Sequence, residues 1–134
     1  MILLDKNNYD KVTEPLKAVK VNHLFARSVA EEQVIGTIYV DNPDNPTTFY
    51  IVHPYGMSLL FGDIDHHDFN SHLLDYLLNT SKVRDKVEWL QAYPDSWNIK
   101  LAALVGEKLI KSHDNDGNKF HDNNPPHLNC IKFV

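Results

Sequence analysis

The sequence lacks several features that would set a chain of this size apart from ordinary globular domains. It has one cysteine, Cys130, so an internal disulfide is excluded and a reducing cytosol suits the chain best. No apolar run approaches the roughly 20 residues that a membrane-spanning helix needs. The N-terminus turns polar at Asp5, too early for the apolar region of a secretory signal peptide. These absences predict a soluble, cytoplasmic protein without a membrane partner.

Basic charge is scarce as well. The chain has 13 Lys and Arg against 18 Asp and Glu, a formal net charge of −5. A protein that binds nucleic acid regardless of its sequence needs clustered Lys and Arg to neutralise phosphates, so no nucleic-acid partner is expected. With 134 residues, 43% of them hydrophobic, the chain can build an ordinary core. We therefore expect a single domain over residues 1–134.

The spacing of apolar residues is helical in the first third of the chain. It predicts a short helix over residues 12–19, with Pro15 in its first turn, and a second helix over residues 21–29, capped by Asn22. The middle of the chain is rich in β-branched and aromatic residues separated by turn residues. It predicts an antiparallel meander of three strands, over residues 34–40, 48–52 and 57–61.

Helical spacing then returns. Residues 69–78 predict a helix capped by Asp65 or Asp68, and residues 97–108 predict another, capped by Asp95 or Ser96, with Gly106 near its end. A strand over residues 87–93, a mobile polar loop over 112–127 and a closing strand over 128–134 complete the prediction. The predicted class is α+β, an antiparallel meander of three to five strands packed by three to four helices.

The densest group of titratable side chains follows the third strand of the meander. It comprises Asp63, Asp65, His66, His67 and Asp68, with His72 one helical turn later. Imidazole and carboxylate groups bind zinc, and a histidine can act as a general base. The candidate catalytic residues are Asp63, His66 and His67, and the candidate metal ligands are Asp65, His66 and His72. Without a His-Glu-x-x-His motif, the simpler interpretation is a polar loop with a capping aspartate and no metal.

One stretch partly matches a cofactor motif. Gln33-Val-Ile-Gly36-Thr-Ile38 approaches the acyl-CoA signature Gln/Arg-x-x-Gly-x-Gly/Ala, whose backbone amides meet the pyrophosphate at the N-terminus of the next helix. Here Ile38 replaces the small residue, and the segment is predicted to continue as a strand. We therefore expect no cofactor site in this chain.

Several segments together resemble a known family. They are residues 22–29, 34–43, Gly62-Asp63, 73–77 and 88–97. In this order they resemble the N-terminal half of the zwittermicin-resistance-type branch of GNAT (Gcn5-related) acetyltransferases, over roughly residues 3–134. In that family the N-terminal half is a degenerate GNAT-like α+β domain. A second GNAT domain carries the acetyl-CoA loop and transfers the acetyl group to an amine.

The resemblance implies an accessory domain, non-catalytic alone, that contributes substrate or partner binding to an N-acetyltransferase. A catalytic GNAT domain would then be the partner of this chain, and acetyl-CoA and a small amine substrate would bind with that partner. Two alternatives stay open. One is a self-contained enzyme or metal-binding protein that uses the Asp63–His72 cluster, and the other is a homodimeric interaction module joined through an exposed strand of the meander.

Overall fold

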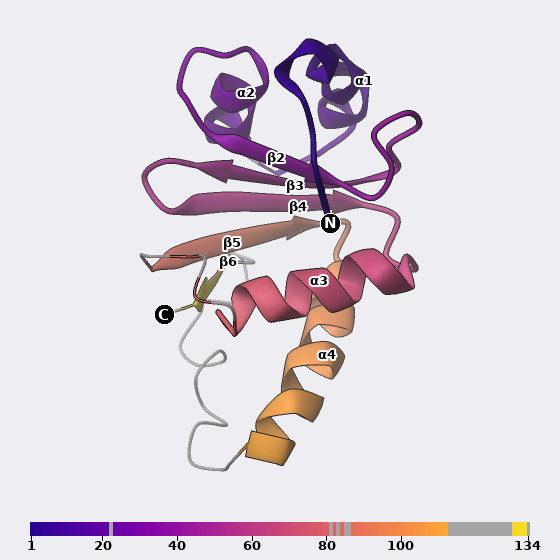
Figure 1. Cartoon of the computed structure of the whole chain (residues 1–134), viewed down its shortest axis with the longest axis vertical. Helices are drawn as coiled ribbons and strands as arrows, with labels where there is room; N and C mark the ends of the chain where they lie inside the picture. Colours follow the sequence, from indigo (N-terminus) through magenta and orange to yellow (C-terminus); the bar gives the residue numbers. More distant parts are fainter. Residues whose placement is uncertain (22, 81, 83, 85–86, 113–129, 134) are drawn as a thin grey trace.

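A computed structural model describes residues 1–21, 23–80, 82, 84, 87–112 and 130–133 (Figure 1). These residues form a six-stranded sheet and four α-helices. The strands are β1 (Ile2–Leu3), β2 (Thr37–Val40), β3 (Thr48–His53), β4 (Met57–Gly62), β5 (Glu88–Tyr93) and β6 (Cys130–Phe133). The helices are α1 (Asp10–Lys17), α2 (Leu24–Ala30), α3 (His67–Leu77) and α4 (Ser96–Ser112), with a 3₁₀ turn, η1 (Lys6–Asn8), before α1.

The order of the strands in the sheet follows the order of the chain. Every neighbouring pair is antiparallel except β4 and β5, which are parallel. A parallel pair needs a crossover connection, and α3 supplies it. The predicted α+β class and the meander, now β2–β3–β4, are confirmed. The sheet has six strands rather than three to five, because the two-residue strand β1 extends it beyond β2.

Helices cover both faces of the sheet. Figure 1 shows α1 and α2 on one side of the strands and α3 and α4 on the other. Side chains alternate along β3, so Phe49 and Ile51 join the core beneath α1 and α2, whereas Tyr50 joins the core beneath α3 and α4. All three are at most 2% exposed, which places β3 in the middle of the molecule.

Two local expectations in the first third are wrong. Pro15 lies in the last turn of α1, not in its first. The short helix loses one internal hydrogen bond there, but it keeps Val12 and Leu16, one turn apart, buried against the sheet. The strand expected from residue 34 begins at Thr37, because the Gln33 and Val34 amides donate to the Ser28 carbonyl at the end of α2. The cap expected at Asn22 falls outside the described residues.

The C-terminal expectations are met in part. The last helix runs past Gly106 to Ser112, so that glycine lies inside α4. The strands expected over residues 87–93 and 128–134 are present as β5 and β6. Apart from Ser112, the loop predicted over residues 112–127 falls outside the described residues. Among the described residues, no helix is both long and apolar enough to cross a membrane.

Gly62 ends β4 in a backbone conformation that other residues rarely adopt. Its φ is +107°, and a Cβ there would lie 2.2 Å from the Thr47 carbonyl oxygen. We expect Gly62→Ala to lower the free energy of unfolding by about 2–3 kcal/mol, because both the dihedral and the contact must change. Urea unfolding followed by circular dichroism measures this change.

The matched control is Gly106→Ala. A Cβ at Gly106 meets nothing within 4 Å, and the residue lies inside a helix. This variant should raise the free energy of unfolding by about 0.5–1 kcal/mol, because alanine loses less backbone entropy than glycine. Equal effects of the two substitutions would contradict the assignment of Gly62 as a conformationally required glycine.

Candidate functional site

The segment between β4 and α3 lies where the meander gives way to parallel pairing. In sheets with parallel strands, ligands bind beyond the carboxyl ends of the strands, at the point where the connectivity changes. The residues after Gly62 occupy that position. The segment predicted from sequence as the candidate site thus follows the carboxyl end of β4, and its side chains decide what it can do.

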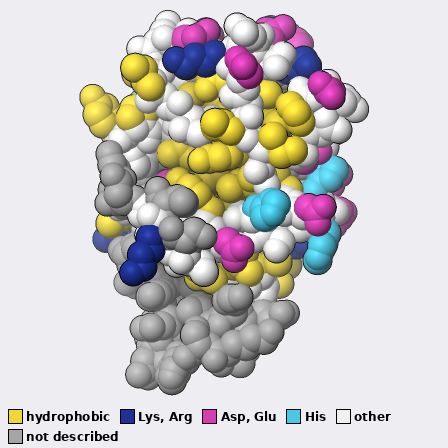
Figure 2. Space-filling view, viewed as in Figure 1, with side chains coloured by type: hydrophobic (Ala, Val, Ile, Leu, Met, Phe, Trp, Pro, Cys, Tyr) yellow, Lys and Arg dark blue, Asp and Glu magenta, His cyan; other side chains and the backbone are white. Residues whose placement is uncertain are grey.

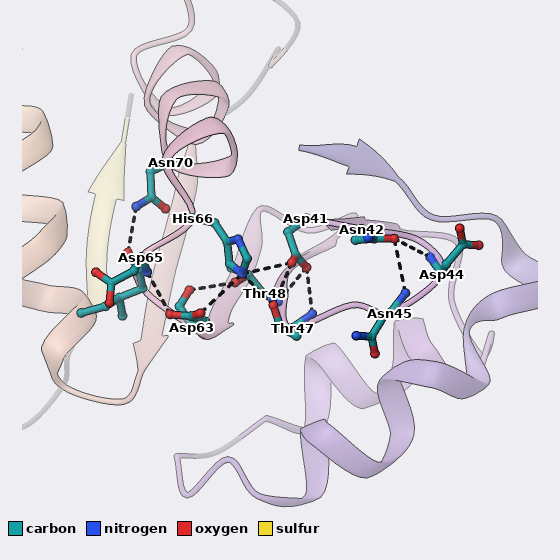
Figure 3. Close-up of polar contacts among 11 residues, drawn as sticks. Asp41, Asn42, Asp44, Asn45, Thr47, Thr48, Asp63, Asp65, His66 and Asn70 are labelled. Atoms are coloured by element: carbon teal, nitrogen blue, oxygen red, sulfur yellow. Dashed lines mark hydrogen bonds and ion pairs between the residues drawn. The ribbon is translucent and has the colours of Figure 1, made fainter.

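His66 joins this segment to the β2–β3 loop (Figure 3). Its Nε2 lies 2.7 Å from Thr47 Oγ1, 3.1 Å from Asp41 Oδ2 and 3.4 Å from Asp63 Oδ2. The Thr47 hydroxyl donates its one hydrogen to Asp41 Oδ2 at 2.8 Å, so its oxygen accepts from His66. This network assigns a proton to Nε2. His66 therefore cannot offer Nε2 as a base or a metal ligand while the network is intact.

Asp41 is the centre of the network. Its Oδ1 accepts from the backbone amides of Thr47 and Thr48, at 2.8 and 2.9 Å, and its side chain is 8% exposed. Burial opposes ionisation of the Asp41 carboxyl, but these amides and the Thr47 hydroxyl together hold its pKa below the usual range. The charged carboxylate thus closes the β2–β3 loop and secures His66 to it.

Asp65 and His67 face a different neighbour. Both line a cavity of about 350 Å³ between α3 and α4, together with Asn70 and Lys100. The Lys100 ammonium lies 3.8 Å from Asp65 Oδ1, and the Asp65 amide donates to Asp63 Oδ1 at 3.0 Å. Although they are adjacent in sequence, His66 and His67 therefore belong to separate environments.

His72 lies near the chain terminus instead. The Met1 α-amino group is 2.6 Å from His72 Nδ1, and burial lowers the pKa of this amine despite the opposing charges of Asp68 and Asp41. The three candidate metal ligands thus have three different partners: Lys100 for Asp65, the Asp41 network for His66, and Met1 for His72. In the part of the chain that the structure describes, no three His, Cys, Asp or Glu side chains are placed to hold one metal ion.

The N-terminus of α3 also differs from the sequence expectation. Its N-cap residue is His66, whose side chain makes no capping hydrogen bond, so neither Asp65 nor Asp68 caps the helix. Asp68 instead lies in the first turn. With Asp63 and Asp65 nearby in sequence, it surrounds the positive end of the helix dipole with negative charge. Such a helix end is a poor site for phosphates, which carry the same sign.

The crevice beyond the carboxyl ends of β4 and β5 is filled. The two strands stay paired along five residues, from Met57 with Trp89 to Phe61 with Tyr93. At the end of this ladder the Trp97 indole N–H donates to the Gly62 carbonyl at 3.1 Å, and the Trp97 side chain is fully buried. The buried Trp97 side chain thus packs against the carboxyl end of β4.

A second polar cluster lies in the core beneath α3. Glu88 on β5 is 2% exposed; its Oε2 accepts from the buried Tyr50 hydroxyl, and its Oε1 accepts from Tyr76 at 2.7 Å. The Tyr50 hydroxyl also lies 2.9 Å from Ser58 Oγ. Sequence reasoning missed this cluster. Its signal was a glutamate on the same face of a strand as Leu90 and Ala92, where the period of two predicts an apolar side chain.

Comparison with known proteins assigns this chain to no family. The sequence matches no protein-family model, and no curated protein is significantly similar to it.

The Asp41 network makes a testable contribution to stability. We expect Asp41→Asn to lower the free energy of unfolding by about 1–2 kcal/mol at neutral pH, because the amide group cannot accept all the hydrogen bonds that the carboxylate accepts. The pKa of Asp41 is lowered by folding, so its contribution is complete above the unfolded pKa and falls as pH drops through the folded pKa. The difference between wild type and variant should therefore shrink below about pH 4.

Urea unfolding at a series of pH values gives this difference directly. Asp44→Asn is a suitable control, because Asp44 lies in the same loop and contacts Asn42 and Lys11 through its backbone rather than its carboxylate. A difference between wild type and D41N that stays constant down to pH 2 would contradict the role assigned to the ionised carboxylate.

Proposed function

We propose that this chain is an accessory domain related to the GNAT acetyltransferases, which contributes substrate or partner binding and does not transfer acetyl groups alone. The proposal rests on the resemblance of roughly residues 3–134 to the N-terminal half of that family. It agrees with the α+β arrangement, in which a β-meander, a helix and a parallel strand follow one another.

The observation that carries the non-catalytic part is the filled crevice at the end of the parallel pair. An acyl-CoA thioester would need room beyond the carboxyl ends of the strands and amide groups free to meet its phosphates. Trp97 occupies the room beyond the strand ends. Asp63, Asp65 and Asp68 surround the N-terminus of α3 with negative charge. We infer that acetyl-CoA would act only through a catalytic partner domain.

The two alternatives receive less support. A self-contained enzyme or metal protein would need Asp65, His66 and His72 to act together, and each has a separate partner. A homodimer joined through the meander would need a free strand edge there. Both outer strands of the meander are paired within the chain, β2 with β1 and β4 with β5.

Isothermal titration with acetyl-CoA tests the proposal. We expect no binding at millimolar ligand, because the ligand would have to displace a buried indole and approach three carboxylates. Micromolar binding would overturn the non-catalytic part of the proposal, as would acetylation of a panel of small amines by the chain alone at a rate well above background.

Trp97→Ala serves as the structural companion to this titration. Removal of a fully buried indole should lower the free energy of unfolding by about 3–5 kcal/mol, measured by urea unfolding. A loss below about 1 kcal/mol would mean that the indole does not fill a packed crevice. Trp97 would then not be the reason that the chain fails to bind the cofactor.

A further inference from the structure

Glu88 is a buried carboxylate that forms no ion pair with any Lys or Arg among the described residues. Both of its oxygens accept hydrogen bonds from neutral tyrosine hydroxyls. The buried Arg84 directs Nη1 and Nη2 to the carbonyl oxygens of Phe133 and Leu77, at 3.1 and 2.7 Å. A buried charge is costly unless it is paired, so Glu88 calls for an explanation beyond stability.

Two tyrosine rings bond to Glu88 through their hydroxyls, and a third ring contacts both of them. Tyr50 is fully buried, while Tyr39 on β2 and Tyr76 on α3 are half-buried. The ring centroid of Tyr76 lies 5.4 Å from that of Tyr50 and 6.0 Å from that of Tyr39, and the Tyr39 and Tyr50 rings stack at 6.5 Å. We call the exposed parts of Tyr39 and Tyr76 the tyrosine shelf.

Apolar side chains adjoin the shelf. Leu3 pairs with Tyr39 across the β1–β2 ladder and is 63% exposed, and the partly buried Val52 belongs to the same core cluster as Tyr39 and Tyr76. In Figure 2 an apolar surface lies open to the viewer above α3, over the strands of the sheet. The shelf is therefore a half-buried aromatic surface beside the exposed Leu3 and the partly buried Val52.

The negative charge of Glu88 acts on both tyrosines of the shelf. Burial first, and the Glu88 charge second, raise the pKa of both Tyr39 and Tyr76, while the Arg84 charge opposes the increase at Tyr76, so both hydroxyls stay protonated. Aromatic faces attract cations, and a negative charge behind the rings in a poorly solvated core adds to that attraction. The same charge repels carboxylates and phosphates, while an uncharged apolar ligand gains nothing from it.

We propose that the tyrosine shelf binds a small organic cation, with a methylated ammonium nitrogen against Tyr39 and Tyr76 and its apolar body toward Leu3 and Val52. The negative charge of Glu88 attracts the positive charge of the ligand. This site does not depend on the proposed relation to acetyltransferases. A quaternary nitrogen has no N–H to acetylate, and a titration without an acetyl donor permits no transfer to a hydroxyl, so its binding is measured separately from acetyl transfer.

Titration of the whole chain with choline, followed by NMR, tests the site. Its matched neutral analogue is 3,3-dimethylbutan-1-ol, in which a carbon replaces the charged nitrogen. We expect choline to shift the tyrosine ring signals at millimolar concentrations and to bind about tenfold more tightly than the alcohol. Equal affinity for the two would mean a merely apolar patch, and no shift with choline would mean no site; either result overturns the proposal.

Variants of Tyr39 distinguish the contribution of the aromatic face to choline binding from the contribution of apolar surface area. Tyr39→Phe keeps the aromatic face and should keep most of the affinity for choline, whereas Tyr39→Leu keeps apolar area and should lose about fivefold or more. Glu88→Gln should weaken choline binding and leave the binding of the alcohol unchanged. The control for loss of one negative charge is Glu14→Gln, on the exposed surface of α1.

Folding of each variant is checked by circular dichroism. Should Glu88→Gln fail to fold, the comparison of Tyr39→Phe with Tyr39→Leu decides, because Tyr39 is only half-buried. Equal binding of choline by these two Tyr39 variants would contradict the proposal. Failure of choline to bind leaves the acetyl-CoA titration unaffected, and binding of acetyl-CoA leaves the choline result unaffected, so the two proposals fail separately.

Discussion

The parallel pairing of β4 with β5 is the constraint on which the rest of the structure depends. A chain that runs as an antiparallel meander can place its next strand parallel only by crossing one face of the sheet, and α3 makes that crossing. Crossing fixes α3 over the sheet and places the α3–β5 connection at the opposite end of the strands. At the carboxyl ends of this pair, the buried Trp97 indole donates a hydrogen bond to the Gly62 carbonyl.

Polar contacts hold α3 at both ends. Near its start, His66 meets Asp41 and Thr47 of the β2–β3 loop, and the Asn70 amide group donates to the Ile64 carbonyl at 2.8 Å. Near its end, Tyr76 donates to Glu88 on β5, and Arg84 joins the Leu77 carbonyl to that of Phe133 on β6. The apolar stripe of α3 supplies most of its stabilisation, while these directional bonds select one position along the sheet.

The sequence predicted the elements well where one physical signal governs them. The meander follows from β-branched and aromatic runs between turn residues, and α3 from Phe69, Leu73 and Leu77 on one face. The sequence could not predict β1, because two residues are too few to show an alternating pattern. It also could not predict the late start of β2, which depends on backbone hydrogen bonds to the Ser28 carbonyl. Its candidate site was a run of neighbours in sequence, and the fold separates them: His66, His67 and His72 face different elements.

The residues that matter most for chemistry come from distant parts of the chain, which explains why sequence reasoning passed over them. Asp41 meets His66 from a different loop, and Tyr50 meets Glu88 across 38 positions. Glu88 is recognisable in the sequence because it interrupts the apolar face of β5. Its tyrosine partners are identified only by the structure. The two carboxylates differ in their surroundings. Asp41 accepts hydrogen bonds from the amides of the loop that it closes, whereas Glu88 lies behind an accessible aromatic surface.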